Sequence, residues 1–388
     1  MKEGGEMIEF SKSYDEFSGR YQEAAKYGEN LLPLSIAESN AVCPKFVQDI
    51  IIETLNKKPL EYARPSNNLY EIISQKNKYK NVKLGKQNIA FDLSALSLLV
   101  HAIKVFTDRE DGIIVFTPVY FRFFELIKMN NRILYECQLK ETENKGYVID
   151  FDELEKIMSK SEVKLLLICN PHNPVGQIWD FPTLKKISLL AESYGLQIVS
   201  DEIHSDLAFL SSKFTSFMKL SDTAIIIDSP TKSFNTQALK IGYAISKDAT
   251  RITLIENEVN KSGTGNPSLL AMQAMKSVYG SEGELWLKDY KKIIRFNIEY
   301  LENTIKKMMP DFSMYYPEAS FLVWVDTKSQ EKLIKFLKNL EMDNGVLVSN
   351  GCKFLDPKGT HFRINCGVDS MLFMKSCGIM VKAYNQVD

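Results

Sequence analysis

The stretch Ala224-Ile-Ile-Ile-Asp-Ser-Pro-Thr-Lys-Ser-Phe-Asn235 does most to decide the fold. Its first half is a short apolar run, which is typical of a buried strand. Its second half places Lys232 directly behind the hydroxyl side chains of Ser229 and Thr231. We therefore expect Lys232 at the edge of a sheet, beside small groups that suit phosphate oxygens.

A lysine beside a phosphate-binding segment is the pairing that a Schiff-base cofactor such as pyridoxal phosphate requires. The motif Ser-x-x-Lys also occurs in penicillin-binding proteins and β-lactamases, where the serine attacks the substrate. Their companion motifs Ser-Asp-Asn and Lys-Thr-Gly are missing from this sequence. The neighbouring segments must decide between the two alternatives.

Two upstream segments have the same layout of an apolar run followed by polar residues. Residues 165–176 run from Leu-Leu-Leu-Ile-Cys into the turn-rich Asn-Pro-His-Asn-Pro-Val-Gly, and residues 196–204 run from Leu-Gln-Ile-Val-Ser into Asp-Glu-Ile-His. In an open α/β sheet, ligands bind beyond the carboxyl ends of the strands. The sequence therefore predicts that Asn173, Asp201 and Lys232 converge at one edge.

The order of these motifs resembles fold-type I pyridoxal-phosphate enzymes of the class I/II aminotransferase superfamily. More narrowly, it resembles their cystathionine β-lyase and cystalysin-like branch of C-S lyases. The similarity extends from Leu32 to Asn365. It implies an α/β fold of the aspartate aminotransferase type, with a large cofactor-binding domain at 46–281 and a small domain formed by 1–45 and 282–388.

The local patterns agree with a mainly parallel sheet between helices. Helical patterns cover 97–106 and 181–194, and the periodic segment 285–309 reads as one long helix. Strand-like runs occupy Gly112–Phe116, Arg132–Cys137, Val163–Cys169, Leu196–Ser200, Ala224–Asp228 and Ile241–Ile245.

Composition limits the classes of partner and compartment. The formal charge is −1, with 48 basic and 49 acidic residues, so we expect neither a nucleic-acid partner nor an anionic membrane surface. The longest mostly apolar stretch, 94–106, contains His101 and Lys104, which argues against a membrane span. The six cysteines are scattered without metal-type spacing, so we expect free thiols in a reducing cytoplasm and no metal site.

The resemblance assigns roles to the residues at the sheet edge. Lys232 is expected to bind the cofactor covalently, and Asp201 to pair with the pyridinium nitrogen so that the ring accepts electrons from Cα. Asn173 is expected to donate to the ring 3-oxygen, and Tyr120 to stack on the ring. Alternatively, Asp201 caps a turn and Tyr120 is an ordinary core residue. For His204, contact with the cofactor and packing beneath it stay equally open.

The phosphate is expected at Ser229, Thr231 and the backbone amides of Ser94 and Ala95, because a helix N-terminus binds anions. The resemblance adds Lys240 as a basic partner. It also adds Tyr62, which in relatives reaches the phosphate of the neighbouring subunit and implies a homodimer with shared sites.

For the substrate, the resemblance gives Arg363 the amino-acid carboxylate, which a planar guanidinium can hold with two hydrogen bonds. Tyr62 and the backbone near Ala37 are expected to line the substrate mouth.

The chain departs from the lyase branch at the mouth of the expected site. It has Ala-Glu-Ser-Asn-Ala at 37–41 instead of Ala-Asp-Met-Asp-Phe, and Glu61 and Asp92 where relatives have glycine. An ionised Asp92 aimed at the phosphate would weaken binding, so we expect it to point away or to be screened, for example by Lys240. The identity of the substrate side chain is therefore open.

The sequence leaves three hypotheses for function. The first is a C-S β-lyase that acts on cystathionine or related S-substituted cysteines. The second is an aminotransferase, because the same residues serve either reaction. The third is a non-catalytic regulatory relative, against which the intact Lys232, Asp201 and Arg363 argue.

Overall fold

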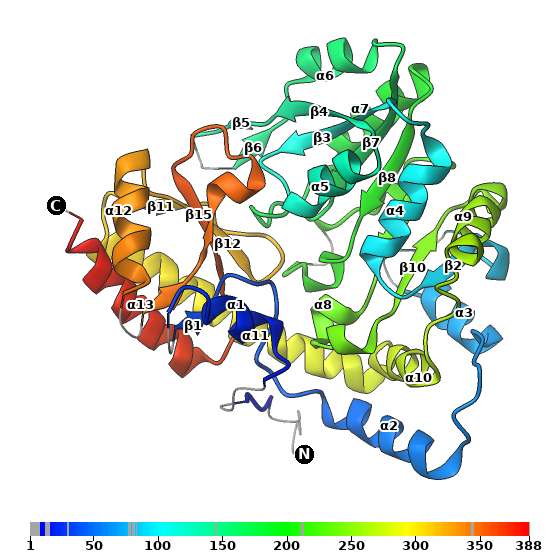
Figure 1. Cartoon of the computed structure of the whole chain (residues 1–388), viewed down its shortest axis with the longest axis horizontal. Helices are drawn as coiled ribbons and strands as arrows, with labels where there is room; N and C mark the ends of the chain where they lie inside the picture. The colour runs from blue at the N-terminus through cyan, green and yellow to red at the C-terminus, as the bar shows by residue number, and fades with distance from the viewer. Residues whose placement is uncertain are drawn as a thin grey trace.

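The computed structural model describes residues 8–11, 16–28, 31–76, 79, 82, 84–143, 146–210, 213–342 and 345–387. The chain forms two lobes, each built on its own sheet, with helix α11 (Ser281–Met308) running along both (Figure 1). Among the described residues, we find no helix that combines the length and the apolar character needed to span a membrane.

The large lobe is built on a seven-stranded sheet in the order β2-β10-β9-β8-β7-β3-β4. Strands β9, β8, β7, β3 and β4 are parallel to one another, whereas β10 runs antiparallel to both β9 and β2. The expectation of a mainly parallel sheet is thus confirmed. The bounds are β2 Ile89–Asp92, β3 Gly112–Thr117, β4 Ile133–Gln138, β7 Val163–Cys169, β8 Gln197–Asp201, β9 Ile225–Asp228 and β10 Gly242–Ile245.

Helices cover both faces of this sheet, because successive side chains of each strand point to opposite faces. In β3, Ile113 and Val115 pack with one group of helices, and Ile114 and Phe116 pack with the other. The first group is α4 (Ala95–Phe106), α5 (Phe121–Met129) and α9 (Ala249–Ser262). The second includes α3 (Asn67–Ser74), α6 (Phe151–Met158), α7 (Phe181–Ser193) and α10 (Leu269–Val278).

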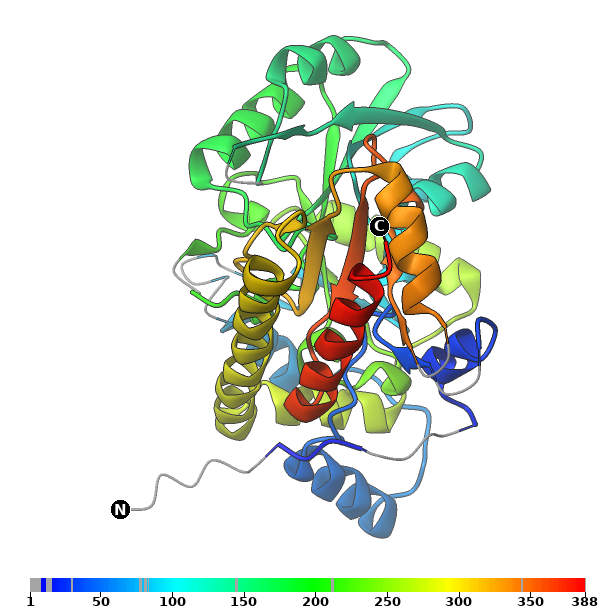
Figure 2. The same ribbon diagram turned by 90° about the vertical axis from the view of Figure 1, so that its left-hand side faces the viewer.

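The small lobe has a four-stranded antiparallel sheet in the order β11-β12-β15-β14. Helices α11, α12 and α13 lie side by side on one face of it (Figure 2). The bounds are β11 Ser313–Met314, β12 Leu322–Asp326, α12 Gln330–Leu340, β14 Ser349–Asn350, β15 His361–Asn365 and α13 Ser370–Tyr384.

The N-terminal segment contacts both lobes. Strand β1 (Leu32–Pro33) pairs in parallel with β13 (Val346–Leu347), next to the short helix α1 (Gly19–Ala24). Helix α2 (Lys45–Lys57) follows and packs against α10. Two short strands, β5 (Lys140–Glu141) and β6 (Tyr147–Val148), pair separately. The predicted division of the chain into domains at 46–281 stays a prediction.

The expected elements are present with small shifts at their ends. Helix α11 begins at Ser281 instead of residue 285, and α4 begins at Ala95 instead of residue 97. The earlier start of α4 has a clear cause, because Ser94 and Ser97 cap each other reciprocally across the first turn. Strand β2 is not among the expected strands.

Candidate active site

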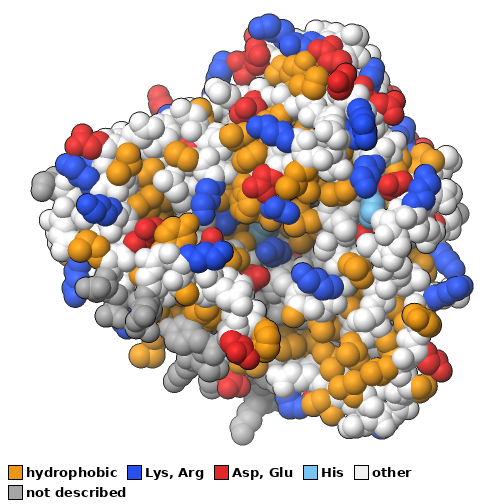
Figure 3. All heavy atoms as spheres, in the orientation of Figure 1, with side chains coloured by type: hydrophobic (Ala, Val, Ile, Leu, Met, Phe, Trp, Pro, Cys, Tyr) orange, Lys and Arg blue, Asp and Glu red, His pale blue; other side chains and the backbone are white. Residues whose placement is uncertain are grey.

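Lys232 lies on α8 (Thr231–Phe234), the short helix that begins three residues after β9 ends. Its Nζ donates a hydrogen bond to the carbonyl oxygen of Ala37 at 2.7 Å. Both residues line a cavity of about 760 Å³ between the two lobes. Basic, acidic and apolar side chains meet on this face of the molecule (Figure 3).

The lysine amine is tuned toward its neutral form. Burial and the nearby Arg363 guanidinium together lower the pKa of Lys232 to about 8, although the carboxylates of Glu38 and Asp201 act in the opposite direction. A neutral amine is the nucleophilic form that attacks a carbonyl carbon. At neutral to slightly basic pH, therefore, this lysine has both the position and a substantial fraction of the neutral state that covalent chemistry needs.

Asp201 ends β8 and points into the same cavity. The backbone N–H of Ile203 donates to its Oδ1 at 3.1 Å. Burial raises the pKa of this carboxyl to about 6, because desolvation disfavours the charged form more than the positive charge of Lys232 stabilises it. A cationic ring nitrogen would supply a partner for this carboxylate.

Arg363 and Asn173 meet at the opposite wall of the site. Arg363, in the middle of β15, donates from Nη1 to Asn173 Oδ1 at 3.1 Å and from Nη2 to the Ser35 carbonyl at 2.9 Å. Its guanidinium also lies over the Phe354 ring, 4.6 Å from the centroid. The Asn173 oxygen is thus engaged, which leaves its amide N–H₂ group to donate elsewhere.

A helix N-terminus faces the cavity at the end expected for phosphate. Ser94 caps α4, and Ser94, Ala95 and Leu96 all line the cavity. Gly242 of β10 lies directly behind, so that a Cβ atom at this position would be 2.7 Å from the Ala95 nitrogen. Thr231 and Lys240 line the cavity as well. These groups form a concave set of donors that suits an anion.

Ser229 and Asp92 lie outside the cavity lining, so Asp92 points away as expected, and the phosphate role predicted for Ser229 stays a prediction. Ser229 does not line the cavity, because its hydroxyl donates to the Ile241 carbonyl at 2.7 Å and contacts Thr231 Oγ1 at 2.9 Å. Asp92 is fully buried outside the cavity, and its partner is His101 Nε2 at 3.0 Å rather than Lys240. Although burial alone would raise the pKa of Asp92, hydrogen bonding to His101 holds it below the usual range.

Aromatic and imidazole groups complete the wall. Tyr120 precedes α5 and lines the cavity, and burial raises its pKa to about 12. His172, from the predicted turn, hydrogen-bonds the Pro118 carbonyl at 2.8 Å and so supports the segment that carries Tyr120. His204 lines the cavity and also bonds Ser320 Oγ through Nδ1 at 3.0 Å, and its two alternative roles toward the cofactor stay predictions.

Tyr62 and Glu61 lie apart from this cavity within the single chain. Tyr62 is fully exposed and Glu61 is exposed, on the connection between α2 and α3. In the altered segment 38–40, only Glu38 lines the cavity. Ser39 accepts from the Ala41 N–H at 2.9 Å, and Asn40 accepts from the Asp369 N–H at 3.0 Å. The roles predicted for Tyr62 stay predictions.

Sequence reasoning missed several residues at the mouth of the cavity. They come from α1, from α5, from the 3-10 turn Gln237–Leu239, and from the 3-10 turn Gly351–Phe354 and its flanks. No motif marks these positions, and those from α1 and from the turn Gly351–Phe354 and its flanks reach the site through tertiary packing alone. They are Glu23, Phe121, Phe124, Glu125, Gln237, Ser349, Cys352, Lys353 and Leu355.

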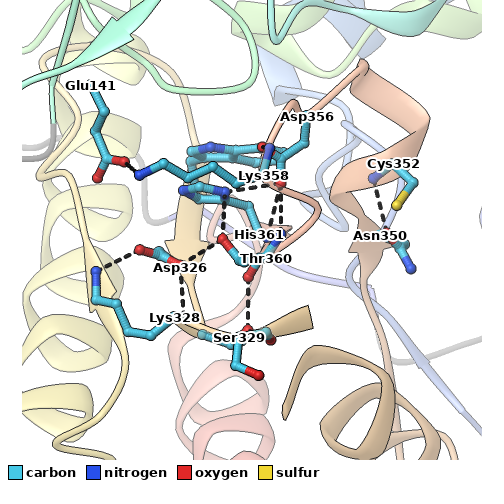
Figure 4. Close-up of polar contacts among 12 residues, drawn as sticks. Glu141, Asp326, Lys328, Ser329, Asn350, Cys352, Asp356, Lys358, Thr360 and His361 are labelled. Atoms are coloured by element: carbon cyan, nitrogen blue, oxygen red, sulfur yellow. Dashed lines mark hydrogen bonds and ion pairs between the residues drawn. The ribbon is translucent and has the colours of Figure 1, made fainter. Parts of the chain in front are cut away.

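A second group of charged side chains joins the lobes outside this cavity (Figure 4). Glu141 of β5, Asp326 of β12 and His361 of β15 place possible metal-ligating atoms within 4.8 Å of one another. Both carboxylates already have cationic partners, since Lys358 pairs with Glu141 and Lys328 Nζ lies 2.5 Å from Asp326. We therefore interpret the group as an ionic link between the β5–β6 hairpin and the small lobe.

Comparison with known proteins identifies similar sequences and structures. The family model described as aminotransferase class I and II matches residues 49–375. Cystathionine beta-lyase PatB of Bacillus subtilis is 29% identical over 344 residues, which are 87% of this chain and 88% of PatB. An asparagine–oxo-acid transaminase of Streptococcus mutans is 21% identical over 384 residues, with 95% of this chain and 94% of that protein covered.

Among solved structures, cystalysin from Treponema denticola, which contains a pyridoxal 5'-phosphate cofactor, matches with a TM-score of 0.90 and 25% identity. The match covers 98% of this chain and 100% of cystalysin.

The cavity meets the demands of pyridoxal 5'-phosphate with residues of this chain. It has an amine of lowered pKa at Lys232, a buried carboxyl of raised pKa at Asp201, and a helix N-terminus at Ser94 and Ala95. These groups match the aldehyde, the ring nitrogen and the phosphate of the cofactor, respectively. The protein is accordingly a pyridoxal-phosphate-dependent enzyme.

Proposed function

The chain belongs to the class I and II aminotransferase family, and from that premise we propose that it is a C-S β-lyase. Its substrates in this proposal are cystathionine or related S-substituted cysteines, and its products are a thiol, pyruvate and ammonia. The observation that carries the proposal is the convergence of Lys232, Asp201 and Arg363 on one cavity. The similarity to a cystathionine beta-lyase and to cystalysin favours elimination as the reaction.

When bound, the cofactor supplies an electron sink for the pair left on the substrate Cα after its proton is removed. Asp201 would hold the ring nitrogen in its protonated form. Its carboxyl has one backbone donor, Ile203, and faces the cavity, so a cation there removes the penalty of burial. Asn173 would donate from its amide nitrogen to the ring 3-oxygen, and Tyr120 would pack on the ring.

Lys232 would take the Cα proton. Its amine has a pKa of about 8 because of burial, close to the working pH that favours a general base. Arg363 would hold the substrate carboxylate, since its position is already fixed by Asn173 and by the Ser35 carbonyl. Fixing the carboxylate orients the bonds at Cα and Cβ, so that the breaking Cβ–S bond can align with the ring orbitals.

The phosphate would lie at the N-terminus of α4, against Ser94 and Ala95, with Thr231 and Lys240 beside it. Ser229 would act through its neighbour, because its hydroxyl accepts from the Thr231 N–H at 3.2 Å and fixes the start of α8. This set would anchor one end of the cofactor while Lys232 and Asp201 engage its ring.

The proposal includes a homodimer in a reducing cytoplasm. Apolar side chains gather over α2 and α10 (Figure 3), and Ile52, Leu55, Leu60 and Tyr62 are exposed. A second copy of this chain would cover them and bring Tyr62 to the neighbouring phosphate. All six cysteines are free, which supports a reducing compartment.

The decisive experiment measures turnover without any added keto acid. Purified protein with bound cofactor is mixed with L-cystathionine, and thiol, pyruvate and ammonia are assayed. We expect the three products in equal amounts, because a thiol of pKa about 8.5 leaves readily as thiolate. The Lys232→Ala variant is the control and should form none of them.

Two outcomes would replace the proposal. If thiol and pyruvate are absent but an amino group passes stoichiometrically to 2-oxoglutarate, the protein is an aminotransferase, as the similarity to a transaminase allows. If a panel of amino acids gives neither reaction although the cofactor binds, the non-catalytic alternative takes its place.

A further inference from the structure

Most charged side chains that line the cavity have a partner on this chain. Glu125 forms an ion pair with Arg122, in which Oε2 of Glu125 lies 2.7 Å from Nη1 of Arg122. Lys353 Nζ lies 3.8 Å from Glu23 Oε1. Arg363 and Asp201 have the hydrogen bonds given above. Their charges are therefore already compensated or assigned to the cofactor and the substrate carboxylate.

Glu38 is the exception among the acidic residues of the lining. Across the described part of the chain, its carboxylate makes neither a hydrogen bond nor an ion pair, and its side chain is half-buried at the cavity wall. The negative charge lies close enough to Lys232 to influence its titration. A carboxylate that is partly removed from water and lacks a partner attracts a cation.

The backbone that carries Glu38 is fixed on both sides. Its N–H donates to the Ile36 carbonyl at 2.9 Å, and its own carbonyl accepts from Asn365 Nδ2 at 2.6 Å. The preceding carbonyl, of Ala37, is the partner of Lys232. The Glu38 side chain therefore begins beside the catalytic amine, on a segment that has little freedom to move away.

The proposed reaction indicates which part of the substrate lies beside Glu38. In the proposed reaction, Arg363 takes the α-carboxylate and the cofactor takes the α-amino nitrogen, so only the sulfur substituent is left to meet Glu38. The cavity of about 760 Å³ has room for such a substituent beside the cofactor. The complement of an unpaired carboxylate in this position is an ammonium group.

We propose that Glu38 determines specificity by binding an ammonium group on the sulfur substituent of the substrate. The preferred substrates are then S-substituted cysteines whose substituent is cationic or zwitterionic, a class to which cystathionine belongs. This inference rests on the proposed lyase function for its substrate class. Glu38 could instead act on the reaction through Lys232, because its carboxylate raises the pKa of Lys232, which burial lowers. The test must separate this second role from substrate binding.

The test compares two amino acids of equal size, S-(2-aminoethyl)-L-cysteine and S-propyl-L-cysteine, which differ in replacing a terminal methyl group by an ammonium group. For each protein with bound cofactor, the dissociation constant comes from the rapid change in cofactor absorbance, and kcat/KM comes from pyruvate release. We expect the wild type to bind the aminoethyl compound about tenfold more tightly. In Glu38→Gln the ratio should fall to about one.

Glu125→Gln is the matched control, because Glu125 lines the same cavity but is paired with Arg122. This variant should keep the wild-type preference. In the wild type, the preference should also decrease as salt is raised, which tests the ion pair without any substitution.

An unchanged ratio in Glu38→Gln, or a wild-type preference that does not respond to salt, would overturn the inference. A shift only in the pH midpoint of the cofactor absorbance, with the ratio intact, would overturn it too, because Glu38 would then act on Lys232 alone. If neither compound yields pyruvate but Glu38→Gln still removes the binding preference, the lyase proposal is wrong and the role of Glu38 stands.

Discussion

The buried carboxylate of Asp201 lowers the stability of the cofactor-free protein. In an unfolded chain an aspartate has a pKa of about 3.9. Burial in the folded protein raises that of Asp201 to about 6. For an acid shifted upward, the folded state binds protons more tightly than the unfolded state between these two values, so stability falls as the pH rises through this window. Above pH 6 the full penalty of the buried charge is present.

Asp201→Asn should therefore stabilise the cofactor-free protein. At pH 8 the expected gain is about 2–3 kcal/mol, from a shift of roughly two pKa units, and it should vanish at about pH 3, where both states are protonated. Denaturant unfolding of the cofactor-free wild type and variant at the two pH values measures it. The same variant should bind pyridoxal phosphate more weakly. Equal stability of the two proteins at pH 8 would contradict this account of Asp201.

Lys232→Ala should abolish the covalent link to the cofactor. Borohydride reduction followed by peptide mapping should find the reduced adduct at Lys232 in the wild type and nowhere in the variant. Lys240→Ala is the control, because Lys240 lines the cavity at the phosphate end. It should weaken cofactor binding yet keep the reducible link. An adduct on another lysine in Lys232→Ala would show that the site is wrongly assigned.

For single residues, the sequence could predict the placement of site residues that follow the buried parallel strands. Asp201 and Lys232 were expected at one sheet edge because both come directly after apolar runs, and both line the cavity. It could not predict which way a hydroxyl group turns, as Ser229 shows by bonding to Ile241. Nor could it place Lys353, which enters from the small lobe through tertiary packing alone.

The contact of α4 with β10 makes the phosphate end sensitive to one glycine. A methyl group at Gly242 would meet the Ala95 nitrogen at 2.7 Å and the Ser94 carbonyl carbon at 2.7 Å. Gly242→Ala should push the first turn of α4 away, lowering stability by about 1–3 kcal/mol through overpacking. The backbone amides of this first turn face the cavity. The affinity of the Gly242→Ala variant for pyridoxal phosphate should therefore fall about tenfold or more.

Gly378→Ala is the matched control for that substitution. Gly378 lies inside α13 with no atom within 4 Å of the added Cβ, so the change should stabilise the protein by about 0.5–1 kcal/mol. Cofactor titration and thermal unfolding of both variants measure these effects. If Gly242→Ala binds the cofactor as tightly as Gly378→Ala, the α4 terminus is not the phosphate site.

Strands were predictable from the sequence where nearly all of their residues are buried. Strands β7 and β9 are buried along nearly their whole length, so their apolar runs stand out in the sequence. The antiparallel pairing of β10 with β2 left no such mark, because it depends on a long-range contact between residues about 150 positions apart. The very short strands of the small lobe, such as β11 and β14, were likewise too short to be recognised.

For the whole molecule, the largest prediction is that one chain does not complete the active site. Tyr62 lies outside the cavity of its own chain and is fully exposed, although the family resemblance gives it a role at the phosphate. Ile52 and Leu55 on α2 and Leu60 on the following connection, which also carries Tyr62, are exposed as well. Apolar groups of this kind are normally covered, and a two-fold dimer covers the same patch on both subunits.

A hybrid dimer tests this arrangement directly. Tyr62→Ala and Lys232→Ala should each be inactive or strongly impaired alone, for different reasons. In a dimer with one subunit of each kind, one site has both substitutions and the other has neither. Co-expression with two different affinity tags, followed by purification over both, isolates this hybrid, which should regain about half of the wild-type activity per dimer. Each single-variant homodimer carried through the same purification is the control. An active monomer in sedimentation, or a verified hybrid without recovered activity, would show that Tyr62 serves no neighbouring site and that each chain works alone.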